Sequence, residues 1–168
     1  MLTIKKLVAV ILVAVFTVGF AGVGYALTSP QVGQNHGVIT GMLVSDHGLK
    51  LSGEYGLTPK LALMGTMGDP ISRLGVKYEL DGNFALVGGV TESSPFIGIN
   101  GSHQFNSDIT GIYEFDLSAR RSDLSLMYEL GLKINLDAKV DLRAGILGFI
   151  EDDHHHFHTL EVGVGYKF

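Results

Sequence analysis

The sequence predicts an all-β protein, a closed antiparallel transmembrane β-barrel of ten strands with short turns on both sides; eight strands are the alternative. Three observations support this fold. Short runs of alternating apolar and polar residues recur about every thirteen residues, separated by turn-forming residues. The last run reaches the final residue of the chain, which is aromatic. Within the runs, charged side chains fall on one face and large apolar side chains on the other.

The first 26 residues have the pattern of a secretory signal. Lys5 and Lys6 are followed by an apolar run that ends at Phe20, and small residues lead to Ala26. This pattern predicts cleavage after Ala26. A retained membrane anchor is the alternative, but the apolar run is short for a spanning helix and no positive stop-transfer flank follows it. We therefore expect an exported protein from which residues 1–26 are removed.

The composition excludes several classes of protein. Beyond the signal, no apolar run approaches the roughly 20 residues of a membrane-spanning helix. The chain has no cysteine, which excludes disulfide bonds and thiol chemistry. A net charge of −5 without a basic stripe argues against nucleic-acid binding. We expect one domain, the barrel over residues 37–168, preceded by an aperiodic leader over 27–36 that is either flexible or tucked in.

The alternating runs define the expected strands in chain order. They cover residues 37–45, 49–57, 61–67, 71–80, 84–92, 96–105, 109–119, 124–134, 139–150 and 157–168. Most are near the 9–11 residues that a tilted membrane strand needs. Asp81 and Gly82, between two alternating runs, form the strongest hairpin signal. The first hairpin has the weakest pattern, and the eight-stranded alternative merges or omits it.

The polar face of the strands carries the charges that we expect to line the lumen. Glycine and small polar residues fill most of the rest of this face. The lumen charge network consists of Lys50, Glu54, Arg73, Lys77, Glu79, Glu114, Asp116, Glu129, Lys133, Asp141, Arg143, Glu161 and Lys167.

Alternation alone does not decide which face looks inward. A soluble barrel of the lipocalin type would enclose the apolar face, whereas a membrane barrel encloses the polar one. Several dozen large apolar side chains would overfill a barrel of this size, because small barrels have room only for their own side chains. The glycine-rich polar face suits a confined lumen, which favours the membrane barrel.

Aromatic residues gather at one level of the predicted strands. If both termini are periplasmic, this level is the periplasmic rim, where aromatic girdles meet lipid headgroups. The residues of this predicted girdle are Tyr55, Tyr78, Phe84, Phe105, Tyr166 and Phe168.

The C-terminal strand provides a more specific signal. Its apolar face is formed by Leu160, Val162, Val164, Tyr166 and Phe168. This ending resembles the last strand of bacterial outer-membrane β-barrels, in which it is the signal read by the insertion machinery. Over the mature chain, the architecture resembles small barrels of the OmpA/OmpX type, without a family-specific motif. The resemblance implies an integral protein of the outer membrane of a diderm bacterium, with outer-membrane lipid and the barrel-insertion machinery as partners.

An open sheet edge is not tolerated in hydrocarbon, because each unpaired backbone group costs several kcal/mol. The last strand must therefore pair with the first one, which begins near Gly37. This requirement makes the first strand structurally important despite its weak pattern.

The lumen charges allow two functional interpretations. They can pair with one another and plug the lumen, since buried charges need partners. Alternatively, they can line a narrow channel for ions or small solutes, similar to a porin. A barrel this small with long charged side chains favours the plug, because open aqueous pores occur in barrels of roughly 16 strands or more.

A histidine-rich loop precedes the last strand. His154, His155, His156 and His158 follow three acidic residues and could bind a divalent transition metal adventitiously. The sequence lacks defined metal-ligand spacing, which favours a solvated acidic loop and no cofactor.

An enzyme that modifies lipid A is the third hypothesis, because some small outer-membrane barrels deacylate or acylate lipid. His103, near the periplasmic end of one strand, and Ser107, in the turn after it, are the candidates, but their spacing and level differ from the deacylase motif, in which histidine and serine lie two residues apart. We therefore expect a non-enzymatic protein, structural or weakly pore-forming.

Overall fold

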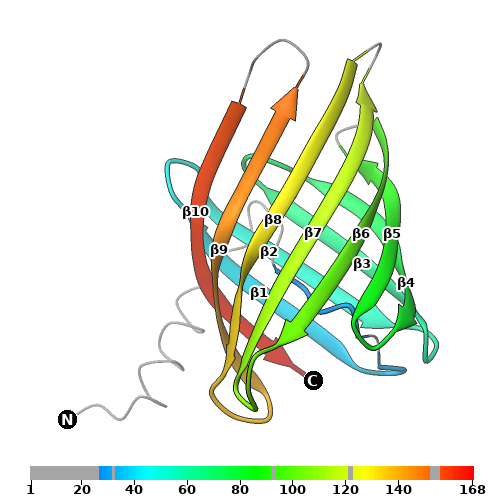
Figure 1. Ribbon diagram of the computed structural model, residues 1–168, viewed down its shortest axis with the longest axis vertical. Coiled ribbons are helices and arrows are strands. Elements are labelled where there is room, and N and C mark those ends of the chain that lie inside the picture. Colours follow the sequence, from blue (N-terminus) through cyan, green and yellow to red (C-terminus); the bar gives the residue numbers. More distant parts are fainter. Residues whose placement is uncertain (1–26, 32, 92–93, 121–122, 152–155) are drawn as a thin grey trace.

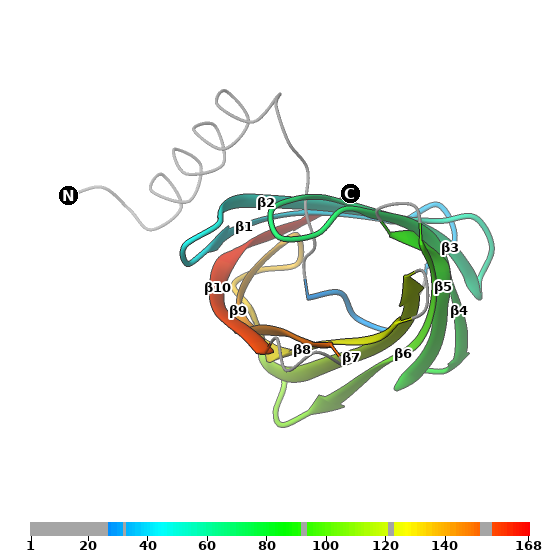
Figure 2. The same ribbon diagram turned by 90° about the horizontal axis from the view of Figure 1, so that it is seen from above.

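The computed structural model describes residues 27–31, 33–91, 94–120, 123–151 and 156–168. These residues form ten antiparallel strands that close into a single barrel, in the order β1-β10-β9-β8-β7-β6-β5-β4-β3-β2 (Figures 1 and 2). The strands are β1 (Gly37–Val44), β2 (Gly48–Gly56), β3 (Leu61–Gly68), β4 (Arg73–Asp81), β5 (Phe84–Thr91), β6 (Ser94–Gln104), β7 (Ile109–Arg120), β8 (Asp123–Asn135), β9 (Val140–Glu151) and β10 (His156–Lys167). The prediction of ten strands is confirmed, and no boundary differs from its expected position by more than two residues. In this described part of the chain, no helix is long and apolar enough to cross a membrane.

The barrel closes where the first strand meets the last. β1 pairs with β10 from Val38 opposite Lys167 to Val44 opposite Glu161. Beyond this ladder, the amide of Gly37 donates to the carbonyl of Phe168 at 2.9 Å, and the amide of Phe168 donates back at 3.0 Å. The ring of Phe168 lies over Gly37, where it fills the space that a Cβ atom would need. The C-terminal aromatic residue thus packs its ring on the seam. Its backbone amide and carbonyl also form hydrogen bonds across the seam, as closure in hydrocarbon requires.

We call the end of the barrel where β1 begins and β10 ends the base, and the opposite end the top. Each of the four turns at the base begins with a residue whose side chain accepts hydrogen bonds from backbone amides two and three positions later, at 2.7–3.3 Å. These residues are Thr58, Asp81, Asn106 and Asp137. Asp and Asn favour turns because of this bond, and Thr forms it more weakly. The sequence therefore specifies the hairpins at the base locally.

The wall of the barrel is uneven in height. Strands β1–β5 have 8 or 9 residues, whereas β6–β10 have 11 to 13. Figure 1 shows β7–β10 rising beyond the other strands at the top. Because 9–11 tilted residues cross the hydrocarbon, this taller wall extends past it.

The outer surface is apolar and the interior is charged. Leu74 and Ile97 on the outside are 64% and 66% exposed, whereas Lys50 and Lys77 on the inside are completely buried. A soluble barrel shows the reverse arrangement. The enclosed charges and exposed apolar side chains are those of a transmembrane barrel.

Gly53 of β2 faces outward, so substitutions at this position can test whether the outer surface contacts lipid. Gly53 pairs with Ile39 and Gly65 on the outer face, and there is open space where its Cβ would lie. We expect Gly53→Lys to destabilise the barrel by up to about 2–4 kcal/mol near the bilayer midplane and less near an interface. Gly53→Leu, the matched control, should cost nothing. The measurement is denaturant unfolding in lipid vesicles, and greater tolerance of lysine than of leucine would contradict the arrangement.

Candidate functional site

The lumen holds the charged residues that the sequence assigned to it. Nine of the thirteen are buried: Lys50, Arg73, Lys77, Glu114, Asp116, Glu129, Asp141, Arg143 and Glu161. The other four, Glu54, Glu79, Lys133 and Lys167, are partly exposed. The structure gathers at least eleven of the thirteen side chains into ion-paired groups at different heights.

The first group crosses the lumen from β4 to β7. The guanidinium of Arg73 donates to the carboxylates of Glu114 and Asp116, and both acids are buried. The same guanidinium lies 4.9 Å from the ring centroid of Phe96, within the range of a cation–π contact. β4 and β7 are separated by two strands in the sheet, so these bonds tie facing parts of the wall together.

The second group is centred on Lys50 of β2. Its ammonium donates to Glu129 of β8 at 2.9 Å and to Glu161 of β10. All three side chains are buried, with at most 3% of the residue exposed. The ammonium therefore serves two carboxylates that come from different parts of the wall.

The third group lies toward the base. Arg143 contacts Asp141 at 2.6 Å, and Lys167 contacts the same carboxylate at 3.3 Å. Lys77 pairs with Glu54 at 2.6 Å. Charges buried in this way are costly unless they are partnered, which explains why each of these groups combines both signs.

Besides the charges and the glycine and small polar residues expected on this face, large apolar side chains also lie in the lumen. One cluster near the top consists of Ile71, Met127 and Leu147, with Phe149 packed against it. A second cluster comprises Met64, Val87 and Phe96. Met64, Val87 and Phe96 belong to strands without charged residues, β3, β5 and β6. The residues of the first cluster, by contrast, are in phase with nearby charges; Met127, for example, lies two residues from Glu129. That phase was the available signal.

The top of the lumen is narrowed further by aromatic rings. Phe157 of β10 lies 6.3 Å from Phe149 between ring centroids. The ring of His47, in the β1–β2 turn, contacts Phe157 edge-on at 4.6 Å. Together with the Ile71 cluster, these rings form an apolar layer between the ion pairs and the top of the barrel.

The beginning of the leader lies inside the barrel. Leu27, Thr28 and Pro30 are buried, and Figure 2 shows this segment within the ring of strands. Residues 33–36 run along the end of β2, where the amide of Asn35 donates to the carbonyl of Gly56 at 2.9 Å. The sequence left open whether the leader is flexible or tucked in, because a stretch without periodicity gives no direction.

The predicted aromatic girdle lies at the base. Five of its members are between 42% and 62% exposed on the outer surface: Tyr55, Tyr78, Phe84, Phe105 and Phe168. Tyr166 is half-buried. The ring of Phe84 packs edge-on against Tyr113 of β7, at 6.2 Å between centroids.

The histidine-rich loop falls largely outside the described residues, which include neither His154 nor His155 nor the side chain of His156. His158 is exposed, and its Nδ1 contacts the hydroxyl of Tyr128. Within the described ranges, no group of three or more His, Cys, Asp or Glu residues could hold a metal ion. Metal binding by the loop stays a prediction.

The enzyme hypothesis rested on His103 and Ser107, which are both exposed at the base. His103 packs its ring against Phe105 at 5.2 Å between centroids. Ser107 lies in the turn that follows β6. The contact that the structure shows for the His103 ring is therefore with an aromatic side chain.

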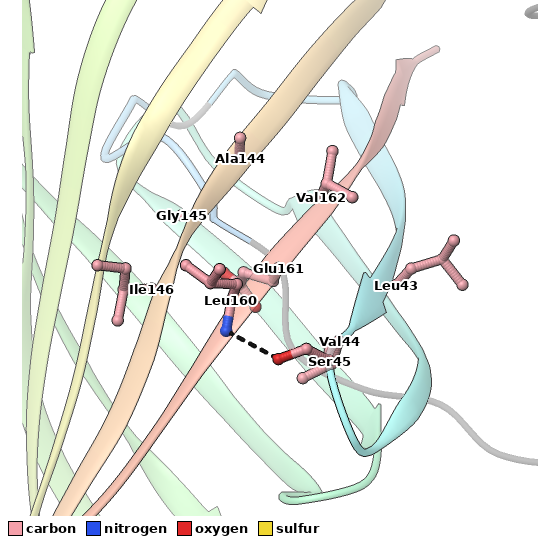
Figure 3. Close-up of a pocket in the computed structure, with 9 residues that line it drawn as sticks. All are labelled: Leu43, Val44, Ser45, Ala144, Gly145, Ile146, Leu160, Glu161 and Val162. Atoms are coloured by element: carbon pink, nitrogen blue, oxygen red, sulfur yellow. Dashed lines mark hydrogen bonds between the residues drawn. The ribbon is translucent and has the colours of Figure 1, made fainter.

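A shallow groove of about 620 Å³ marks the outer surface beside the seam (Figure 3). Its lining comes from β1, β9 and β10 and the β1–β2 turn: Leu43, Val44, Ser45, Ala144, Gly145, Ile146, Leu160, Glu161 and Val162. The amide of Leu160 donates to the hydroxyl of Ser45 at 3.3 Å across the groove. Since Leu43 and Leu160 are more than 60% exposed, this groove faces lipid rather than the lumen.

A closed barrel with an apolar exterior and a charged interior defines an integral β-barrel membrane protein. Residues 14–168 match the family described as outer membrane protein beta-barrel domain. The chain belongs to this family, and it is a small outer-membrane barrel. No curated protein matches the sequence.

Solved structures similar to this chain are also β-barrels. A de novo designed transmembrane β-barrel is 10% identical over 84% of this chain and 100% of that chain, with a TM-score of 0.40. The N-terminal barrel domain of Pseudomonas aeruginosa OprF is 17% identical over 81% and 99%, with a TM-score of 0.41. Yersinia pestis Ail is 15% identical over 80% and 100%, with a TM-score of 0.45. At these scores the assignment rests on the family match alone.

Removal of the Arg73 side chain tests the energetics of the lumen. Arg73→Met takes away the cation that both Glu114 and Asp116 contact, so we expect destabilisation by about 3–5 kcal/mol. Adding Glu114→Gln and Asp116→Asn removes the uncompensated charges and should restore most of the loss. Unfolding in vesicles measures both effects. Equal stability of Arg73→Met and the original protein would show that the two carboxylates do not depend on this cation.

Proposed function

We propose that this protein is a non-enzymatic, structural component of the outer membrane, exported by its signal and inserted as a barrel whose lumen is closed by ion pairs. The observation that carries this proposal is the pair of buried groups around Arg73 and Lys50. Each group joins strands that are not neighbours in the sheet, through side chains that are buried in the lumen.

The energetics of these groups support a closed lumen. Opening a path for ions would require breaking contacts of a buried cation, and breaking a buried pair costs about 3–5 kcal/mol. The apolar clusters around Ile71 and Met64 support the same conclusion, because an apolar constriction disfavours water and ions. The ion-paired groups and the apolar clusters therefore obstruct the same lumen.

A narrow channel for ions or small solutes is the competing function. Its support is the polar wall at the base, where Lys133, Lys167 and Glu54 are only partly buried. Such a wall could admit ions into the lower part of the lumen. Passage to the top would still require displacement of the Lys50 and Arg73 groups.

The outer surface supports lipid and the insertion machinery as partners. Leu160 and Val162 of β10 are 64% and 56% exposed, and the strand ends in the exposed Phe168. This apolar, aromatic-terminated strand is available on the outside of the barrel. We propose that it serves as the insertion signal.

The non-enzymatic assignment is supported by the surroundings of His103, whose ring packs on Phe105. Mass spectrometry of lipid A from cells with and without the protein tests this part of the proposal. Unchanged acylation is expected. A mass shift that disappears in His103→Ala would establish an enzyme instead.

Single-channel recording in planar bilayers tests the closed lumen. We expect no stable conductance steps from the wild-type protein, because buried ion pairs and apolar clusters fill its lumen. Heat-modifiability gels of the same proteoliposomes control for insertion and separate a closed barrel from an absent one. Reproducible steps from fully inserted protein would replace the structural role with a channel.

A further inference from the structure

Three successive carbonyl groups of the leader are held by side chains of the lumen. Arg143 of β9 donates to the carbonyl of Leu27. Asn100 of β6 donates through Nδ2 to the carbonyl of Thr28 at 3.0 Å, and Lys77 of β4 donates to the carbonyl of Ser29 at 3.0 Å. The donors come from three separate strands, and each is buried. The lumen thus recognises the leader backbone over residues 27–29, with one side-chain hydrogen bond to each carbonyl.

The first side chain of the leader fits an apolar pocket. Leu27 is 1% exposed and packs with Met42 of β1 and Ile112 of β7. The floor of the pocket is formed by Gly131 and Gly145; a Cβ atom on Gly145 would lie 2.9 Å from Leu27 Cδ1. The two glycines leave the space that a leucine fills.

The next side chains are held by polar contacts. Lys77 donates to the hydroxyl of Thr28 at 2.7 Å, and Lys133 donates to the hydroxyl of Ser29 at 3.4 Å. The amide of the Gln31 side chain donates to the carbonyl of Gly82 in the β4–β5 turn. The leader therefore contacts the wall through residues 27–29 and again through Gln31 at the β4–β5 turn of the base.

The lumen charge also suits a free amino terminus. The thirteen lumen charges comprise six cations and seven carboxylates. Cleavage after Ala26 would create an α-ammonium group on Leu27, inside the barrel, and would balance this count. Buried charge is least costly when it is compensated.

We infer that the lumen contains a binding site for a short peptide with a leucine-sized first side chain, and that residues 27–31 of the same chain occupy it as a tethered plug. The tether through residues 33–36 and β1 gives the leader a millimolar effective concentration, so weak individual contacts suffice to hold it. The inference goes beyond the closure by ion pairs, which does not require the leader.

The absence of cysteine from the natural sequence allows a clean accessibility test. The mature chain beginning at Leu27 is given a single Thr28→Cys substitution, refolded into vesicles and treated with a hydrophilic maleimide added at the face that carries the base. Ser107→Cys, in an exposed turn at the base, is the matched control. We expect Thr28→Cys to react at least about 100-fold more slowly than Ser107→Cys, because reaction requires local opening. Equal rates would overturn the inference.

A second variant separates burial from specific binding. Leu27→Asp introduces a carboxylate into the apolar pocket without altering the wall, and it should raise the labelling rate of Thr28→Cys to that of Ser107→Cys. Leu27→Met, which keeps an apolar side chain of similar size, should preserve the protection. If Leu27→Asp stays protected, the pocket does not hold the leader and the inference fails.

Binding in trans completes the test. A fluorescent peptide with the sequence Leu-Thr-Ser-Pro-Gln and a free amino terminus should bind saturably to the Leu27→Asp barrel, and the same peptide with aspartate first should not. Absence of saturable binding would contradict the peptide site. Rapid labelling of Thr28→Cys in a barrel that still does not conduct would remove this inference and leave the closed lumen of the proposed function intact.

Discussion

The whole structure depends on one requirement: in hydrocarbon, every backbone amide and carbonyl group must find a partner within the protein. The seam between β1 and β10 meets it with a ladder that ends in the reciprocal bonds of Gly37 and Phe168. Because an aromatic ring needs space on its neighbour, the residue opposite Phe168 is a glycine. Closure then fixes two environments, lipid outside and a confined lumen inside. The alternation of side chains distributes residues between them.

Enclosure is what makes the lumen charges interact. In an open sheet Arg73 would face water, but in a closed barrel it faces the lumen, where β7, three strands away, supplies Glu114 and Asp116. The same geometry brings Glu129 and Glu161 to one ammonium. Space that the charges leave is filled by flexible or flat side chains such as Met127 and Phe96, since voids in a packed interior forfeit contacts. The leader fills the lower part in a comparable way, with a leucine over two glycines.

The sequence was sufficient to predict the positions of the strands, their inward and outward faces, and the pairing of the first strand with the last. Each of these depends on local alternation or on turn chemistry such as that of Asp81 and Asn106. It was insufficient for the interior. Parity tells which face a side chain occupies, but the height and distance of facing residues depend on stagger and tilt, which no local pattern encodes. The contact of Arg73 with a strand three positions away could not be predicted for this reason. Apolar residues on the charged face, such as Leu147, were obscured by the charges beside them. The leader had no pattern at all, and its position depends on groups such as Asn100 that only the closed barrel brings together.

An ionic lumen also explains how a strand finds its register. A buried ion pair contributes little net stability compared with apolar residues of the same size, so stability alone does not account for thirteen lumen charges. Register does. A slip of one residue turns every side chain of a strand to the other face. For β4 this slip would place Arg73 and Lys77 in lipid, at a cost of about 2–4 kcal/mol for each such cation at the midplane. With an apolar lumen face, the same slip would cost almost nothing, because both faces would suit lipid. The charges therefore act mainly against misregistered barrels, and their pairing in the lumen makes the correct register tolerable.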